Sequence, residues 1–346
     1  MSYGTNDASG EACERCRECS AKGMAYCTKC GRPVGALKRA SPAPAPKSEF
    51  GAAANVIGVA LTIVLTAFIF FEIFMIFWGF GDIWANIGSY NGVYILILDP
   101  MPAALFFMTG GASKAYYLFL AASVLISFAV LIRVSRKDLR KIFRPETSVL
   151  ENMPLYSIAT LFAAYMSFAF IFSILLSLAG VTTNTPVFTD EWDDWYDLLN
   201  ASVWEEVLCR VLLIGAPLVL VSLYLGTDRP LRRLFGGSGM NGYALVFIFI
   251  STAVFALAHL PGWDAWKLIP MVFSGIMLGY LFVKYGLYAS IMMHFLVDYM
   301  STPTWIFGDA GDAFLTMLLL AISFLGVIFI VRYAKRGYVY MKGLLA

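Results

Sequence analysis

Long apolar runs constrain this chain more than any other feature. Segments such as 155–179 and 313–333 consist almost entirely of apolar residues. An α-helix needs about 20 such residues to cross a hydrocarbon core roughly 30 Å thick. Because the bilayer core holds no water to satisfy backbone amides and carbonyls, such runs form helices rather than open strands or loops. The sequence therefore predicts an all-α polytopic membrane protein.

Composition supports this class, since 60% of the 346 residues are hydrophobic, only 14% are charged, and the mean hydropathy is +0.73. In the apolar segment 93–108, Asp99-Pro100-Met101-Pro102 leaves pieces too short to span. This segment is expected to be re-entrant or to lie at the interface. About eight transmembrane helices remain, at roughly 52–79, 113–134, 155–179, 199–224, 242–260, 267–283, 286–302 and 313–333.

The charged loops predict the orientation. Basic residues precede the first span and follow the second, fourth and eighth, whereas the alternate loops are acidic. Positive charge favours the cytoplasmic side, so the chain is expected in the cytoplasmic membrane with both termini cytoplasmic. The basic set is Lys38, Arg39, Lys47, Arg133, Arg136, Lys137, Arg140, Lys141, Arg144, Arg229, Arg232, Arg233, Arg332, Lys335, Arg336 and Lys342; the acidic set is Asp190, Glu191, Asp193, Asp194, Asp197, Asp309 and Asp312.

The N-terminal region has a different character. Residues 1–12 are polar and expected to be a disordered tail, and 13–35 carry two Cys-x-x-Cys pairs. Four thiolates at this spacing can bind a structural Zn²⁺, and the pattern resembles small zinc ribbons. Two alternatives stay open. Cys16 and Cys19 could form the first ligand pair, or the segment could be a disulfide-linked or disordered tail without zinc. A Pro/Ala-rich linker, 36–50, leads to a membrane domain at 51–346. The expected zinc ligands are Cys13, Cys16, Cys27 and Cys30.

Ionisable residues inside the predicted spans indicate a site. A charged side chain at membrane depth costs about 2.5–3.5 kcal/mol on insertion scales, so such residues usually face the bundle interior and serve a function. The alternative is a polar contact between helices. The chain's two histidines both fall in spans, and the full set is Glu205, Glu206, Arg210, His259, His294 and Asp298.

The spacing of these residues suggests separate roles for the adjacent glutamates. Glu206 lies four residues before Arg210, the favoured order for a helical ion pair. Glu205 lies about 100° round the helix and has no basic residue three or four positions on, so it is available as a general base. Asp298 lies four residues after His294 and can orient an imidazole or a water.

Three segments carry a family resemblance. Glu205–Arg210 (EEVLCR), Phe255–His259 (FALAH) and His294–Asp298 (HFLVD) resemble, in this order, the EExxxR, FxxxH and HxxxN/D motifs of the CAAX-protease and bacteriocin-processing (CPBP, or Abi) family. That family includes the type II CAAX prenyl endopeptidases. The resemblance covers about 150–303 and implies an eight-helix intramembrane endopeptidase with an internal cavity. It implies that Glu205 activates water and that His259 and His294 orient water, stabilise the oxyanion or bind metal. Asp298 would assist, and Glu206 and Arg210 would support the site.

The sequence leaves the mechanism open between Glu205 as base and a catalytic zinc held by Glu205, His259 and His294. The expected partners are a peptide or protein substrate, lipidated or not, the bilayer, and an unknown partner of the ribbon; no nucleic acid is expected. Alternative functions are an ion- or proton-coupled transporter and a catalytically inactive interaction or immunity protein. The predicted orientation puts Glu205 and His259 in the outer half of the membrane. A cytoplasmic lipidated tail would therefore need a deep cavity to reach them.

Overall fold

A computed structural model of the chain describes residues 14–21, 49–89, 93–95, 103–139, 150–183, 190–226 and 230–345. The chain divides into two units, Met1–Ala52 and Ala53–Ala346. In the first unit, α1 (Glu14–Ala21) carries Cys16 and Cys19, both buried. The other expected zinc ligands, Cys13, Cys27 and Cys30, lie outside the described residues, as do residues 1–12 and 36–48. The zinc ribbon, tail and linker therefore stay predictions.

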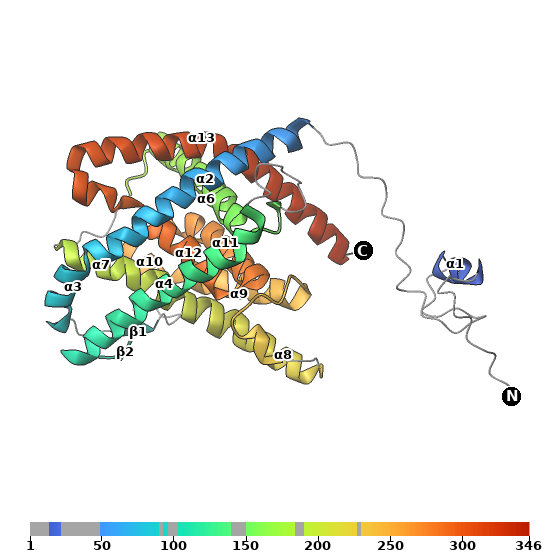
Figure 1. Cartoon of the computed structure of the whole chain (residues 1–346), viewed down its shortest axis with the longest axis horizontal. Coiled ribbons are helices and arrows are strands. Elements are labelled where there is room, and N and C mark those ends of the chain that lie inside the picture. Colours follow the sequence, from blue (N-terminus) through green and yellow to red (C-terminus); the bar gives the residue numbers. More distant parts are fainter. Residues whose placement is uncertain are drawn as a thin grey trace. The chain divides into compact units, whose positions relative to one another are not determined.

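Helices dominate the unit Ala53–Ala346, in which the chain crosses back and forth through a bundle (Figure 1). Helix α6 packs most extensively against α13, α9 against α11, and α12 against both α4 and α11. The bounds are α2 Glu49–Trp78, α3 Phe80–Asn86, η1 Ile87–Ser89, α4 Gly111–Leu139, α6 Pro154–Leu178, α7 Glu191–Asn200, η2 Ala201–Glu205, η3 Val207–Gly215, α8 Ala216–Tyr224, η4 Pro230–Arg233, α9 Gly242–Ala258, α10 Leu260–Trp263, η5 Ala265–Lys267, α11 Leu268–Tyr285, α12 Leu287–Asp298, η6 Tyr299–Ser301 and α13 Pro303–Leu345.

Among the described residues, six helices are long and apolar enough to cross a bilayer. The chain is therefore a multi-pass membrane protein. Two of the eight expected spans are shorter helices, because α9 has 17 residues and α12 only 12. Every residue from Ala289 to Leu296 is buried, so α12 lies inside the bundle. The six long spans are Gly51–Trp78, Gly111–Leu139, Pro154–Leu178, Glu191–Tyr224, Ala265–Tyr285 and Pro303–Gly343.

The interrupted apolar segment 93–108 contains two short strands, β1 (Val93–Ile95) and β2 (Ala103–Phe106). They pair antiparallel, with Tyr94 opposite Ala104 and an irregularity between Val93 and Tyr94. A strand pair of this length is no transmembrane helix, as the proline-containing interruption led us to expect. Its place at the interface or as a re-entrant element stays a prediction.

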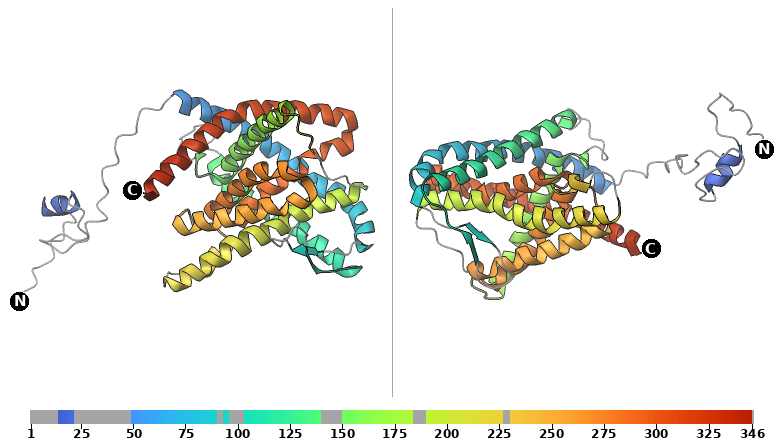
Figure 2. Two further views of the ribbon diagram at one scale, coloured as in Figure 1. Left: turned by 180° about the vertical axis from the view of Figure 1, so that it is seen from behind. Right: turned by 90° about the horizontal axis from the view of Figure 1, so that it is seen from below.

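The long helix that carries the first residues of the candidate site is π-helical in its middle part. Helix α7 continues through η2 and η3 into α8, and Figure 2 shows the run as one long, mostly yellow helix. Both η2 and η3 are π-helical, so their backbone bonds run from residue i to i+5. The wider turn separates neighbouring side chains by a smaller angle than the 100° of an α-helix. Such segments occur frequently at functional sites.

Small residues on α11 let α9 approach closely. A Cβ atom at Gly275 would lie 2.9 Å from the Thr252 side chain, and one at Gly279 would lie 3.0 Å from Ile248. Gly275 and Gly279 are four residues apart, the Gly-x-x-x-Gly spacing that permits close packing of membrane helices. This contact fixes α9, which ends just before His259, against α11.

A glycine-rich loop holds the junction of α11 and α12. The backbone amide of Gly237 donates to the carbonyl of Phe282 at 2.9 Å, and that of Gly239 to Val283 at 2.9 Å. Gly236 has φ 77°, and a Cβ there would lie 2.2 Å from the Phe282 carbonyl oxygen. Gly286, with φ 116°, is the single residue between the two helices. The loop therefore satisfies the carbonyl end of α11 and sets where α12 begins.

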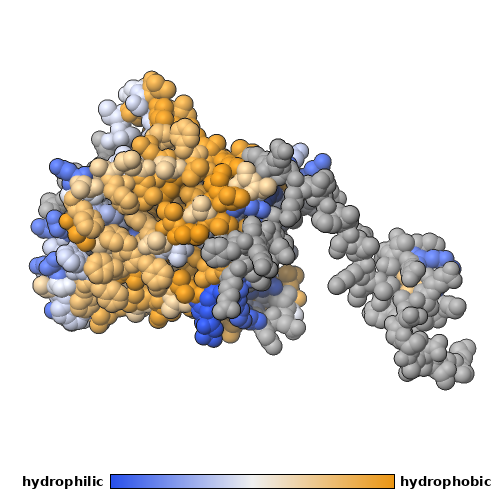
Figure 3. All heavy atoms as spheres, turned by 45° about the horizontal axis from the view of Figure 1, so that its top comes forward, coloured by the Kyte–Doolittle hydropathy of each residue, from blue (hydrophilic) through white to orange (hydrophobic). Residues whose placement is uncertain are grey.

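The surface suits a lipid environment. Large apolar side chains are exposed on several helices, including Phe77 on α2, Ile126 on α4 and Phe324 on α13. Figure 3 shows a largely hydrophobic face on the membrane unit, with hydrophilic residues gathered toward its edges. An apolar surface of this extent is rare on soluble monomers and agrees with the long apolar helices.

Candidate active site

The ionisable residues predicted from the sequence come together from three helices. Glu205 ends η2 and Glu206 directly follows it; His259 caps the end of α9; His294 lies within α12 and Asp298 ends that helix. The Glu205 carboxylate oxygen Oε2 lies 4.0 Å from His259 Nε2 and 3.8 Å from His294 Nε2. The cluster therefore joins segments that are far apart in the sequence.

Exposure divides the cluster into an inner ion pair and an outer set. The side chains of Glu206 and Arg210 are 0% exposed. The Glu205 side chain is 21% exposed, although the two glutamates are adjacent in sequence. The remaining members are each exposed to a lesser extent than Glu205: His294, His259 and Asp298.

The inner ion pair is the one that the i, i+4 spacing predicts. Arg210 Nε lies 3.3 Å from Glu206 Oε2, and Arg210 Nη1 donates to Ser251 Oγ at 3.2 Å. Ser251 Oγ in turn donates to the carbonyl oxygen of Cys209 at 2.6 Å. A buried pair of this kind is costly to break because removing one partner leaves an uncompensated charge. The arrangement ties the π-helical segment to α9, where Ser251 lies.

The second carboxylate oxygen of Glu206 fixes the orientation of His294. His294 Nδ1 lies 3.0 Å from Glu206 Oε1. An ionised carboxylate only accepts hydrogen bonds, so Nδ1 carries the hydrogen and donates it. Nε2 is then left facing Glu205 at 3.8 Å and Asp298 Oδ2 at 3.5 Å.

The Nδ1 atom of His259 is also fixed, by a different acceptor. Its Nδ1 lies 2.7 Å from the carbonyl oxygen of Phe255, one turn earlier on α9. A carbonyl oxygen cannot donate, so His259 Nδ1 carries the hydrogen and Nε2 faces Glu205. Both imidazoles therefore present Nε2 to the same carboxylate, each fixed through the opposite nitrogen.

The Phe255 ring packs between the charged groups. It lies 4.8 Å from the His259 ring and 5.8 Å from the His294 ring, measured between centroids. The Arg210 guanidinium carbon lies 4.7 Å from its centre. Phe255 thus positions two imidazoles and shields the buried Arg210, and its carbonyl is the atom that contacts a site residue directly.

Comparison with known families identifies this region. Residues 193–300 match the family model described as Type II CAAX prenyl endopeptidase Rce1-like. The chain contains an Rce1-like protease domain. The match runs from α7 to just past α12 and includes all three motif segments, within the 150–303 expected from the resemblance. Comparison with curated proteins and with solved structures gave no match.

The Rce1-like family comprises intramembrane proteases, and the chain is assigned to that enzyme class. The outer set of the cluster lines a cavity of about 320 Å³ in this domain. Glu205, His259, His294 and Asp298 all contribute to its wall, whereas Glu206 and Arg210 lie behind it. The apolar, aromatic and small parts of the wall are Tyr165, Leu198, Ala201, Phe255, Ala258, Trp263, Met271, Ser274 and Val297.

The cavity of the Rce1-like domain also contains residues that sequence reasoning missed. Lys267 lines it, with Nζ 3.6 Å from the Trp263 ring centre, and Asp197 lines it from α7. Ser202 Oγ donates to Asp298 Oδ2 at 3.0 Å and so holds that carboxylate. Lys267 is a lone basic residue at a span end that the charge pattern assigns to the acidic side. This mismatch is the sequence feature that could have identified Lys267 as a cavity residue.

The donor types of the Rce1-like cluster suit a zinc ion. Two imidazole Nε2 atoms and one carboxylate form a three-ligand set of the kind found in catalytic zinc sites. Their separations of 3.8 and 4.0 Å exceed the roughly 3.4 Å edge of a tetrahedron with bonds of about 2.1 Å. No group of three or more His, Cys, Asp or Glu side chains in the described part of the chain is arranged closely enough to hold a metal. A zinc held by Glu205, His259 and His294 would need the donors to draw together.

Proposed function

We propose that the Rce1-like domain hydrolyses a peptide bond within the membrane, with Glu205 as the group that activates water. The proposal is supported by one observation above all. Two histidines, each with Nδ1 committed to a fixed acceptor, present Nε2 to the same partly exposed carboxylate at a cavity. This is the geometry expected of a positioned base with orienting groups.

In the first step, a water between Glu205 and His259 attacks the carbonyl carbon of the scissile bond. Glu205 takes the water proton, and His259 Nε2 accepts the other hydrogen as a hydrogen bond. The carbonyl π electrons move to oxygen. His294, protonated at both nitrogens between Glu206 and Asp298, donates from Nε2 to that oxyanion.

In the second step, the tetrahedral intermediate collapses. The C–N bond breaks, and Glu205 returns its proton to the leaving amine nitrogen. One water and one peptide bond thus yield one carboxylic acid and one amine, and Glu205 is ionised again. If a zinc were bound by Glu205, His259 and His294, it would supply Lewis acidity and acidify its bound water.

The buried ion pair of Glu206 and Arg210 serves as a support in this proposal. Glu206 holds His294 through Nδ1, and Arg210 compensates the Glu206 charge. Neither side chain lines the cavity, so neither touches a substrate there. Asp298, which does line it, balances His294 and is itself held by Ser202.

Cleavage by purified protein in lipid vesicles tests the proposal. The probes are a farnesylated peptide that ends in a Cys-aliphatic-aliphatic-X sequence, and the same peptide without the farnesyl group. Wild type is expected to cleave at least one, and Glu205→Gln to lower kcat by about 10²–10⁴-fold. The matched control is Glu191→Gln, an exposed carboxylate of the same long helix outside the cavity. Equal activity in wild type and Glu205→Gln would reject Glu205 as the base.

The same preparation distinguishes the other functions. A transporter would conduct protons or ions across the vesicle membrane without cleaving either probe. An inactive interaction protein would do neither. The substrate class, the cytoplasmic orientation of both termini and a recruiting role for the zinc ribbon belong to the proposal. The family description supports only a peptide or protein substrate.

A further inference from the structure

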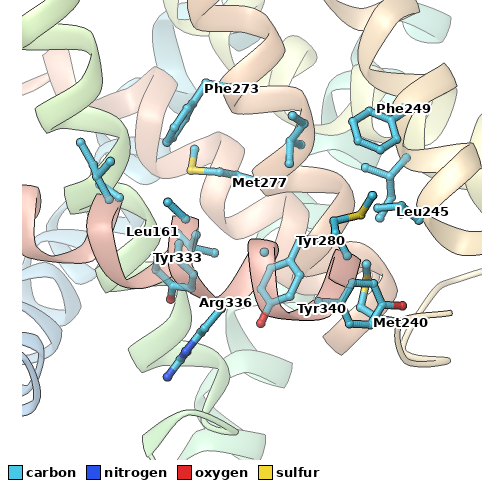
Figure 4. A pocket seen from close by; sticks show the side chains of 17 residues that line it. Leu161, Met240, Leu245, Phe249, Phe273, Met277, Tyr280, Tyr333, Arg336 and Tyr340 are labelled. Carbon is cyan, nitrogen blue, oxygen red and sulfur yellow. The ribbon is translucent and has the colours of Figure 1, made fainter. Parts of the chain in front are cut away.

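A second cavity lies in the unit Ala53–Ala346, with a volume of about 590 Å³. This is within the roughly 300–1,000 Å³ range of ligand pockets. Its wall is formed by α6, α9, α11 and α13 and consists mainly of aliphatic, aromatic and methionine side chains (Figure 4). We call it the apolar groove. Its lining residues include Leu161, Phe249, Ile276, Met277 and Ile330.

The apolar groove is separate from the candidate active site. The two cavities have no lining residue in common. Phe273 and Met277 of α11 line the groove, whereas Met271 and Ser274 of the same helix line the active-site cavity. The Phe273 ring lies at one end of the groove in Figure 4 and stacks on Phe168 at 4.5 Å between centroids. The proteolytic mechanism therefore makes no use of the groove.

Polar side chains gather at the opposite end. Figure 4 shows Arg336, Tyr280 and Tyr340 on one side of the groove, away from Phe273. Tyr280 OH accepts a hydrogen bond from Lys284 Nζ at 2.9 Å, and Lys284 Nζ also donates to the carbonyl oxygen of Glu151 at 2.8 Å. The groove thus ends beside a charged cluster rather than in apolar packing.

This cluster has an excess of positive charge. Arg336 and Arg332 both pair with the single carboxylate of Glu151. Among the residues that the structure describes here, Arg332, Arg336 and Lys284 face the one carboxylate of Glu151, an excess of two positive charges. The Arg336 side chain is 37% exposed and also lines the groove, so a ligand there lies next to this excess of positive charge.

We propose that the apolar groove binds an anionic glycerophospholipid, with one acyl chain along the groove and the phosphate beside Arg336. An apolar cleft between membrane helices matches an acyl chain, and the net positive cluster at its end matches a phosphate that carries negative charge. The tyrosine hydroxyls of Tyr280 and Tyr340 are hydrogen-bond donors at the same end. This inference is independent of the proteolytic function.

Lipid binding to the full-length protein in detergent tests the proposal. Native mass spectrometry would compare phosphatidylglycerol with phosphatidylcholine of the same acyl chains, added at the same concentrations. Phosphatidylglycerol is expected to bind at least about fivefold more tightly, because each basic residue near an anionic head group contributes roughly that factor. Ala334→Trp, from an exposed position on the groove wall, should abolish binding of both lipids.

Matched variants separate the groove from the general surface. Val339→Trp adds the same ring at an exposed position of α13 outside the groove and should leave binding unchanged. Arg336→Gln should remove the preference for phosphatidylglycerol, whereas Lys335→Gln, its exposed neighbour outside the groove, should not. If Ala334→Trp fails to fold, Ile276→Trp blocks the groove from α11. Equal affinity for the two lipids in wild type, or undiminished binding in a folded groove-filling variant, would overturn the proposal.

Discussion

His294 lies between two adjacent glutamates: its Nδ1 is 3.0 Å from Glu206 Oε1, and its Nε2 is 3.8 Å from Glu205 Oε2. Each carboxylate thus faces a different nitrogen of one imidazole. The Glu206 side chain is fully buried and that of Glu205 is 21% exposed. Neighbours in sequence are therefore given different environments, one in the packed interior and one at the cavity.

Substitution of the two glutamates should separate activity from stability. Glu205→Gln should leave the unfolding temperature close to wild type, since this side chain is partly exposed, unlike that of Glu206. Glu206→Gln should destabilise the protein by about 3–5 kcal/mol, because it leaves Arg210 buried without its countercharge. Thermal unfolding in detergent measures both. A Glu206→Gln protein as stable as wild type would contradict the supporting role.

Lys267 should contribute to turnover through its charge. It lines the same cavity as Glu205 and Asp298, where the proposed mechanism develops negative charge on a substrate oxygen. Lys267→Met should lower kcat/KM by about tenfold, or roughly 1.4 kcal/mol. Lys114→Met provides the control, since Lys114 also lies over a tryptophan, Trp84, at 4.9 Å but does not line the cavity. Equal losses in the two variants would indicate a packing effect instead.

Zinc content should depend on the N-terminal cysteines. Elemental analysis of purified protein is expected to give one zinc per chain. Cys27→Ser should remove it, because a structural zinc site needs four ligands. His259→Asn should retain it if Glu205 acts as the base without a metal. Loss of a second zinc in His259→Asn, together with loss of activity on chelation, would instead support a zinc at the membrane site.

Two glycines in the loop against α11 allow backbone strain to be measured apart from a clash. Gly239 has φ 82° with open space around it, and Gly236 has φ 77° with the Phe282 carbonyl in the path of a Cβ. Gly239→Ala should cost about 1–2 kcal/mol from strain alone. Gly236→Ala should cost more, since the loop must also move away from α11. Equal unfolding free energies for the two variants would show that the loop moves away from the Phe282 carbonyl at little cost in free energy.

The charge pattern makes a testable statement about topology. With basic loops cytoplasmic, Lys335→Cys should react with a membrane-impermeant maleimide only after cells are opened, whereas Asp309→Cys should react in intact cells. Both positions are exposed. Wild type sets the background from native cysteines. The reverse labelling pattern would show that the membrane orientation is opposite to the predicted one. The active-site cavity would then lie in the cytoplasmic half of the membrane.

Local spacing accounts for the parts that the sequence predicted well. The Glu206–Arg210 pair follows from one helical turn, and the long apolar helices follow from the thickness of a bilayer. The meeting of Glu205, His259 and His294 was expected from three ordered motifs rather than from any local rule. Their joint presence in the domain match at 193–300 agrees with that reading.

Tertiary features explain what the sequence did not reveal. The π-helical turns on either side of Glu206 are one such feature, because neither apolar periodicity nor charge spacing predicts a π-helix. The shortness of α12 follows from its burial by neighbouring helices, which no hydropathy window detects. Lys267 enters the cavity from a short turn before α11, where periodicity carries no information. Each of these depends on contacts between segments distant in the chain.

Helix α11 separates the active-site cavity from the apolar groove, because its residues line both. Ser274 faces the chamber that must admit water, and its neighbour Phe273 faces the groove suited to lipid. A rotation of α11 by about 100°, the angle between neighbouring residues, would bring Ser274 to the position that Phe273 occupies at the groove. Gly275 and Gly279, which lie against Thr252 and Ile248, oppose that rotation because it would put residues with larger side chains in their places. The two glycines that pack α11 against α9 therefore also keep Ser274 at the active-site cavity and Phe273 at the apolar groove.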